Sequence, residues 1–152
     1  GLEEITIEYL HTKTLGIFVK EGGFSRPWTA EDISDGTLQA LAVLSALSDP
    51  RSTTLVVEEP ENSVHPWITS LLVQRMKDIS QDRTVIVTTH SPVVINLALP
   101  SEIWIAYKKD GHTELTPLTT LDGDVESDWK DGKYKLFEYL ETGAILQAVP
   151  AR

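Results

Sequence analysis

The sequence contains no cysteine, which excludes both a disulfide framework and a zinc site held by thiolates. Basic residues are scarce: 13 Lys and Arg stand against 23 Asp and Glu, so the formal net charge is −10. Because an acidic surface repels phosphates, we do not expect this segment to make the main contact with any nucleic acid. No apolar run approaches the roughly 20 residues that span a bilayer, and the start lacks the features of a signal peptide. We therefore expect a cytoplasmic protein with no membrane partner.

The apolar fraction of 41% and the charged fraction of 24% are those of a globular protein, and 152 residues suffice for one domain. Alternating apolar residues over 5–9 and 15–19 predict an antiparallel β-pair within residues 1–28, followed by a loop that holds Pro27 and Trp28. Residues 38–47 are apolar nearly all round and predict a helix buried on every side, with Ser34 or Asp35 as its cap.

Two β-branched runs, 54–57 and 84–88, are typical of strands buried in a parallel sheet. Between them, Pro66 suits the first turn of a helix. Its apolar face would comprise Ile68, Leu72, Met76 and Ile79. Strand, helix and strand in this order predict a right-handed βαβ unit and an α/β fold, whose core occupies residues 29–100.

Residues 101–152 are expected to form a β-hairpin and a final helix over 134–140, after a short helix that ends near residue 97. Asp110-Gly111 is a strong hairpin turn signal. We expect Trp104 in the core, His11 and His112 in solvated turns, and the acidic stretch 122–128 to be a solvated loop.

Two acids, Glu58 and Glu59, directly follow the first predicted parallel strand. Ligands of open α/β sheets bind beyond the carboxyl ends of the strands, so this position suits chemistry. Glu58 could hold Mg²⁺, and Glu59 could orient a water that attacks a phosphate. The alternative is a solvated loop with two chance acids.

His90 follows the second strand and could hydrogen-bond a terminal phosphate together with a catalytic carboxylate. The alternative is a histidine near a helix start that binds no ligand. Ser34-Asp35-Gly36-Thr37 could present backbone N–H groups to an anion at the start of the predicted helix, or it could be an ordinary N-cap.

Taken together, these motifs resemble those of ABC-type ATPases. Ser34-Asp35-Gly36-Thr37 is similar to the signature loop, Glu58-Glu59-Pro60 to the Walker B motif, and His90 to the switch histidine. The run from Glu61 to Pro66 looks like the D-loop, with Asn62, Ser63 and His65 in it. The pattern is closest to the RecF/SMC/OLD-like bacterial ATPases of the AAA class, although Glu58 stands where an aspartate is usual.

The resemblance implies a P-loop NTPase fold of ABC type in which Glu59 and His90 are catalytic and Glu58 holds Mg²⁺. It also implies a homodimer in which residues 34–37 contact the partner's ATP, and a clamp-like motion used in DNA maintenance or phage defence. DNA or an effector protein would be bound through other regions.

No Gly-x-x-x-x-Gly-Lys-Ser/Thr motif occurs in the sequence. We infer that residues 1–152 are the C-terminal part of one ATPase domain, that the P-loop belongs to an absent N-terminal portion, and that this chain alone is inactive. The alternative is a regulatory or assembly module that binds partners without turnover. For the enzyme, we expect Glu58, Glu59 and His90 to converge, and Ser34 and Gly36 to face outward, away from these acids.

Overall fold

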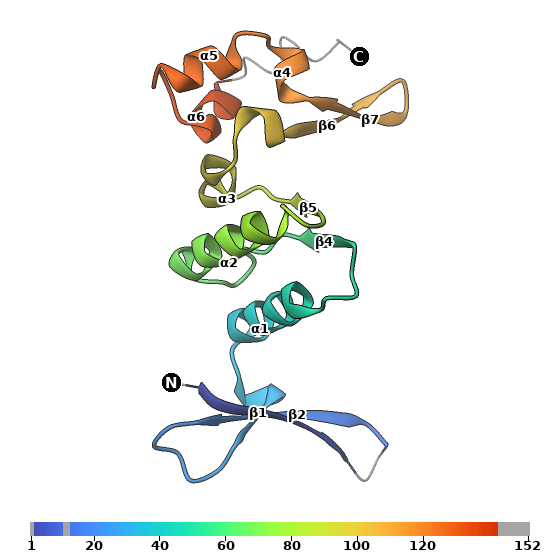
Figure 1. Ribbon diagram of the computed structural model, residues 1–152, viewed down its shortest axis with the longest axis vertical. Coiled ribbons are helices and arrows are strands. Elements are labelled where there is room, and N and C mark those ends of the chain that lie inside the picture. Colours follow the sequence, from blue (N-terminus) through green and yellow to red (C-terminus); the bar gives the residue numbers. More distant parts are fainter. Residues whose placement is uncertain (1, 11–12, 143–152) are drawn as a thin grey trace. The chain divides into compact units, whose positions relative to one another are not determined.

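The computed structural model describes residues 2–10 and 13–142, and the chain divides into two compact units, one up to Thr88 and one from Thr89. Each unit has its own hydrophobic core. Figure 1 labels helices and strands of both units. Within the described residues, no helix is both long enough and apolar enough to cross a membrane.

The first unit begins with the expected antiparallel pair, strands β1 (Leu2–Tyr9) and β2 (Leu15–Glu21). The predicted turn between them falls partly outside the described residues, because positions 11 and 12, including His11, are not described. A third strand, β3 (Trp28–Thr29), pairs antiparallel with β2. The prediction of a loop at Trp28 is therefore wrong. Pro27, which has no N–H to donate, precedes the strand and so does not interrupt its hydrogen bonds.

A short 3₁₀ turn, η1 (Ala30–Asp32), leads into helix α1 (Asp35–Ser48), which Ser34 caps as one of the two expected residues. The expectation that α1 is buried on every side is wrong. Only Val43 and Leu47 are buried, whereas Leu44 is 43% exposed. Helix α1 thus carries more apolar side chains than its neighbours among the described residues cover, because it packs mainly against α2 and strand β4.

The βαβ unit is confirmed. Strand β4 (Thr54–Glu58), helix α2 (Pro66–Ile79) and strand β5 (Thr84–Thr88) follow one another, and β4 and β5 are parallel, with Leu55 opposite Val85. Leu72 and Met76 of α2 pack with buried side chains of α1 and β4. Each such burial contributes about 1.5–3 kcal/mol, which fixes the strand ends relative to the helices.

The two parallel strands are covered on one face only, in contrast to the expectation of strands buried on both. In β4, Leu55 and Val57 are buried, whereas the intervening Val56 is 58% exposed. In β5, Ile86 is 49% exposed. Because parallel sheets are ordinarily covered on both faces, the Val56–Ile86 face lacks a layer within the described residues.

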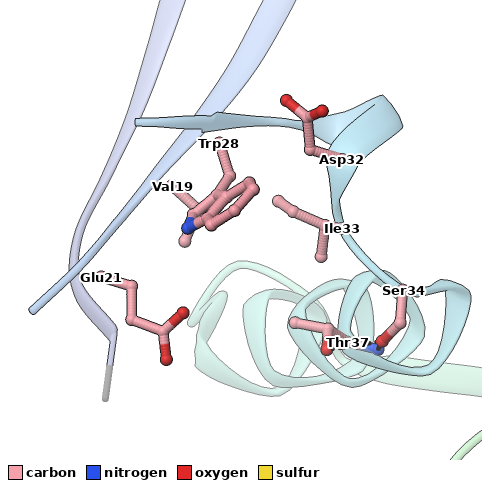
Figure 2. A pocket seen from close by; sticks show the side chains of 7 residues that line it. All are labelled: Val19, Glu21, Trp28, Asp32, Ile33, Ser34 and Thr37. Carbon is pink, nitrogen blue, oxygen red and sulfur yellow. Dashed lines mark hydrogen bonds between the residues drawn. The ribbon is translucent and has the colours of Figure 1, made fainter. Parts of the chain in front are cut away.

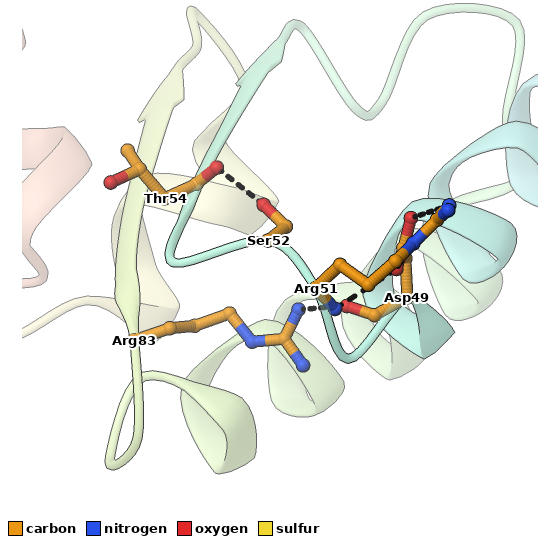
Figure 3. A network of polar contacts seen from close by, with 5 residues as sticks. All are labelled: Asp49, Arg51, Ser52, Thr54 and Arg83. Atoms are coloured by element: carbon orange, nitrogen blue, oxygen red, sulfur yellow. Dashed lines mark hydrogen bonds and ion pairs between the residues drawn. The ribbon is translucent and has the colours of Figure 1, made fainter.

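A polar network joins the end of α1 to the start of the parallel strands (Figure 3). Arg83, in the loop before β5, donates to the backbone oxygens of Asp49 and Leu47. Arg51 pairs with the Asp49 carboxylate, and Ser52 donates to the oxygen of Thr54. A cation at a helix C-terminus satisfies carbonyls that have no intrahelical partner.

The second unit opens with helix α3 (Pro92–Leu97) and a 3₁₀ turn, η2 (Pro100–Glu102). The hairpin of strands β6 (Trp104–Lys109) and β7 (His112–Pro117) is confirmed. Asp110 and Gly111 form its turn with φ of 49° and 79°, as the Asp-Gly pair predicts. His112 is exposed, but it is the first residue of β7 rather than part of the turn.

Two expectations for this unit are wrong. Trp104 is 59% exposed and not in the core, because it lies on the uncovered face of β6. The acidic stretch is not simply a loop: helices α4 (Leu118–Leu121) and α5 (Val125–Lys130) flank a short turn, and Val125 is fully buried. The final helix, predicted over 134–140, is confirmed as α6 (Leu136–Glu141), which starts two residues later than expected.

Candidate functional site

Glu58 and Glu59 lie at the carboxyl end of the parallel sheet. Glu58 is the last residue of β4 and is opposite Thr88, the last residue of β5. The backbone N–H of Glu59 donates to the oxygen of Thr88 at 2.8 Å, which extends the pairing by one bond. Both glutamate side chains are exposed. Two carboxylates therefore stand at the strand end where open α/β sheets bind their ligands.

The backbone at Glu59 is in the left-handed region, with φ of 42°. This conformation is uncommon for a residue with a side chain and costs on the order of 1 kcal/mol or more. It turns the chain away from β4, and the oxygen of Glu59 then accepts from Asn62 N–H at 2.9 Å. Pro60, which follows, is fully buried and anchors the turn. The strain is therefore located at the residue that the motif identifies as catalytic.

The expected D-loop is a second tight turn that leads into α2. Val64 N–H donates to the oxygen of Glu61 at 3.0 Å, and Ser63 has φ of 60°. His65 is the N-cap of α2: its Nδ1 accepts from Trp67 N–H at 3.2 Å, and Pro66 occupies the first turn as expected. Asn62 and Ser63 are exposed. His65 thus has a structural role that the motif comparison alone did not reveal.

The expected signature loop forms the N-terminus of α1. Ser34 Oγ accepts from Thr37 N–H at 3.3 Å, and the hydroxyls of Ser34 and Thr37 lie 2.9 Å apart. Within the described part of the chain, the N–H groups of Asp35 and Gly36 make no hydrogen bond. These two donors, at the positive end of a 14-residue helix, can bind an anion.

Gly36 lies directly against the backbone of the D-loop. A Cβ built on Gly36 would be 2.1 Å from the carbonyl oxygen of Ser63 and 3.4 Å from Val64 Cα. Only glycine permits this approach. The sequence offered a signal that could have found it, because glycine in the first turn of an otherwise apolar, Ala-rich helix sacrifices helix propensity.

His90 lies between the end of β5 and the start of α3, and its side chain is exposed. The adjacent backbone is fixed: Ser91 N–H donates to Thr89 Oγ1 at 2.9 Å, and Ser91 Oγ caps α3 by accepting from Val93 N–H. His90 belongs to the second unit and the two acids to the first. The convergence of His90 with Glu59 therefore stays a prediction.

A cleft of about 430 Å³ adjoins the signature loop. Figure 2 shows the indole of Trp28 and the side chain of Ile33 facing each other across it, with Ser34 and Thr37 at its edge. Trp28 packs edge-on against Phe24, with ring centroids 5.0 Å apart. Asp32, also on the rim, accepts from Thr29 N–H and Oγ1, which holds the pKa of its carboxyl below the usual value.

Within the described residues, no group of three or more His, Cys, Asp or Glu side chains could enclose a metal ion. Mg²⁺ commonly uses only one or two carboxylates and completes its shell with water and nucleotide phosphates. Glu58, exposed at the strand end, fits that kind of site. Mg²⁺ bound with ATP would neutralise charge on the phosphates.

Comparison with known proteins identifies the family. Residues 6–96, more than half of the chain, match the family described as "AAA domain, putative AbiEii toxin, Type IV TA system". No curated protein matches the chain.

A solved structure from a study of ATP-driven dimerization and DNA-stimulated activation of SMC ATPases is similar, with a TM-score of 0.56 and 15% identity over 86% of this chain and 83% of that one. This likeness shows the fold alone: an α/β fold of the ABC-type P-loop NTPases. The chain therefore belongs to the AAA-domain family and is an ATPase-type domain with the expected ABC-like fold.

Proposed function

We propose that residues 1–152 are the C-terminal part of one ATP-hydrolysing domain, in which a homodimer encloses each ATP between one subunit's P-loop and the other subunit's residues 34–37. The main supporting observation is Glu59, held in a left-handed turn at the carboxyl end of two adjacent parallel strands. Within this domain, residues 1–28 would form the β-hairpin segment, 29–100 the motif-bearing core and 101–152 the C-terminal hairpin and helices.

Each residue then has one task. Glu59 accepts a proton from the attacking water, Glu58 holds Mg²⁺, and His90 donates to the terminal phosphate. The free N–H groups of Asp35 and Gly36 bind the terminal phosphate of the partner's ATP. Asn62, Ser63 and His65 form the D-loop, which follows the turn at Glu59.

The P-loop is supplied by an N-terminal portion of the protein that is absent from this chain. The uncovered Val56–Ile86 face supports this inference, since a parallel pair with one bare face requires a further layer. The isolated chain is then inactive, because its sequence contains no P-loop motif to enclose the β-phosphate.

The output of hydrolysis would be a clamp-like movement. The family description names a toxin–antitoxin system, and the similar SMC ATPase is activated by DNA. These two descriptions support a role in phage defence or DNA maintenance. We place that role in the cytoplasm, with DNA or an effector protein bound through regions other than this acidic chain.

Glu59→Gln in the protein that carries the P-loop tests the proposal. Hydrolysis should fall by about 10²–10⁴-fold because the amide cannot accept the proton. ATP binding should persist, and an ATP-bound dimer should accumulate. Glu8→Gln, on the exposed side of β1, is the control and should leave the rate unchanged.

A Glu59→Gln rate above about a tenth of wild type would remove Glu59 from the role of general base. ATP binding by the wild-type protein without any turnover would instead favour a regulatory module.

A further inference from the structure

The cleft beside the start of α1 has the form of a slot for a flat ligand. Its volume of about 430 Å³ lies within the roughly 300–1,000 Å³ that is usual for small-molecule sites. The indole of Trp28 and the side chain of Ile33 face each other across it (Figure 2), and Val19 also lines it. Apolar groups on two opposite walls favour a planar ring system that can stack on the indole.

The wall formed by Trp28 is held in place by its own neighbours. Phe24 packs edge-on against the indole, with ring centroids 5.0 Å apart, and the guanidinium carbon of Arg26 lies 5.9 Å from the centroid of the Trp28 ring. Trp28 is also paired with Val19 in the ladder between β2 and β3. A wall that is fixed in advance loses little conformational entropy when a ligand binds, which favours binding.

The cleft contains a buried hydrogen-bond donor without a partner. The Nε1–H group of Trp28 makes no hydrogen bond within the described residues, and its nitrogen is buried. A buried donor that stays unpaired is costly, so this N–H favours a ligand that offers it an acceptor atom. Because the nitrogen is covered in this structure, a side chain around it must shift when a ligand binds.

Glu21 supplies an acceptor near this donor. Figure 2 shows the indole nitrogen on the side of the ring nearer Glu21, and both residues line the cleft. The Glu21 carboxylate makes no hydrogen bond or ion pair within the described part of the chain. The other carboxylate of the cleft, Asp32, is already bonded to Thr29. Two carboxylates repel a phosphate, so a ligand would enter with an uncharged end that carries N–H groups.

A purine base meets these requirements. It is planar, it stacks on aromatic side chains, and in adenine an amino group lies beside a ring nitrogen that accepts a hydrogen bond. The hydroxyls of Ser34 and Thr37 lie at the edge of the cleft (Figure 2), where they can bond a sugar. We propose that this cleft binds the purine base of a nucleotide, with Trp28 as the stacking wall and Glu21 as the acceptor for the amino group.

Two nucleotides could supply this base. One is the ATP that the proposed function places against residues 34–37, whose adenine would then be bound by the subunit that does not hold its phosphates. The other is a free nucleotide that binds this chain independently of ATP hydrolysis. The first source rests on the proposed function, whereas the cleft and its chemistry do not.

Titration of this chain with adenosine, which has no phosphate, tests the cleft. Nuclear magnetic resonance shows the indole N–H signals of the four tryptophans, and Trp28→Phe identifies the Trp28 signal by its loss. Adenosine should shift that signal with a dissociation constant in the millimolar range, whereas the signal of the exposed Trp104 should stay in place. No shift of the Trp28 signal, or equal affinity for uridine, would overturn the proposal.

Purine riboside, which differs from adenosine in lacking the amino group, tests the role of Glu21. It should bind the wild-type chain about tenfold more weakly than adenosine, because the Glu21 carboxylate has no donor to bond. Glu21→Leu should bind both nucleosides equally, whereas Glu8→Leu, on the exposed side of β1, should keep the preference. If Glu21→Leu does not fold, Glu21→Gln should reduce the preference, since an uncharged oxygen accepts more weakly. A preference unchanged in a folded Glu21 variant would contradict this role.

The source of the base is distinguished in the protein that carries the P-loop, with Glu59→Gln to prevent hydrolysis. If the cleft holds the adenine of ATP, equilibrium dialysis should detect no adenosine binding to the ATP-bound dimer. Adenosine that still binds this dimer would assign the cleft to a free nucleotide. A protein that forms no dimer with ATP would contradict the proposed function, and the titration of this chain would still decide whether the cleft binds a base.

Discussion

Arg83 Nη1 lies 2.9 Å from the backbone oxygen of Asp49, and Nη2 lies 3.4 Å from that of Leu47. One side chain from the loop before β5 thus closes the C-terminus of α1. The signature loop lies at the other end of α1. These two hydrogen bonds therefore help to fix the orientation of α1 and, with it, the position of Gly36.

Replacing Arg83 with Met should lower the free energy of unfolding by about 1–2 kcal/mol, since two carbonyls lose a charged donor while the aliphatic stem is kept. Arg75→Met is the matched control: Arg75 is exposed and, among the described residues, pairs only with Asp78, at 3.6 Å. Surface pairs of this kind are worth about 0–1 kcal/mol. Urea unfolding of both variants measures the difference, and equal losses would contradict the capping role.

In the second unit, the hydroxyl of Tyr139 donates to the carboxylate of Asp122. Tyr139→Phe should cost about 1.5–3 kcal/mol, the range for a hydrogen bond to a charged group. Tyr134 stacks on Tyr139 with centroids 4.7 Å apart, and its buried hydroxyl has no partner within the described residues. Tyr134→Phe should therefore be neutral or stabilising. Thermal unfolding of the two variants is the measurement, and a larger loss for Tyr134→Phe would refute this reading.

The same bond predicts a pH dependence. The hydrogen bond from Tyr139 is the main cause that lowers the pKa of the Asp122 carboxyl, with a smaller effect of Asp124 N–H. Because the pKa of this carboxyl is lower in the folded state than in the unfolded state, its ionised form stabilises the fold. This contribution is fully present above the unfolded-state pKa of about 3.9 and is lost as the pH falls through the folded-state pKa. The stability difference between wild type and Tyr139→Phe should thus be largest near neutral pH and shrink below about pH 4. A difference that grows on acidification has the wrong sign.

The isolated chain should bind ATP only weakly and hydrolyse none, because it has no P-loop. Isothermal titration calorimetry with ATP and Mg²⁺ is the measurement. Micromolar affinity for this chain alone would show that a phosphate-binding loop is not required.

Neighbouring residues of β4 should respond in opposite ways to truncation. Leu55→Ala removes a buried side chain and should cost about 2–5 kcal/mol. Val56→Ser, on the 58% exposed position beside it, should change stability by less than about 0.5 kcal/mol. Val56→Ser should nevertheless weaken binding of the portion that carries the P-loop. If that portion binds Val56→Ser and wild type equally well, it does not cover this face.

The sequence was informative wherever a local signal decides the structure. Ser34 and Pro66 mark the starts of α1 and α2 correctly because caps and first-turn prolines act within a few residues. The positions of Glu58 and Glu59 at a strand end followed from the β-branched run alone.

The errors concern which surfaces are covered, which depends on residues distant in the chain. An apolar composition did not reveal that α1 and the β4–β5 pair are each covered on one side, nor that Trp104 lies on an open face. Around the acidic stretch, the charges obscured three apolar residues, Leu118, Leu121 and Val125, which two short helices bring into one core.

The bare edges of the parallel pair have a practical consequence. Within the described residues, β4 and β5 pair only with each other, so each has an edge of backbone N–H and C=O groups open to another strand. Copies of the isolated chain can therefore associate through these edges without any nucleotide. A dimer found by size alone is then no sign of the ATP-bound state, and only a dimer that forms with ATP and dissociates after its removal reports on the nucleotide sandwich.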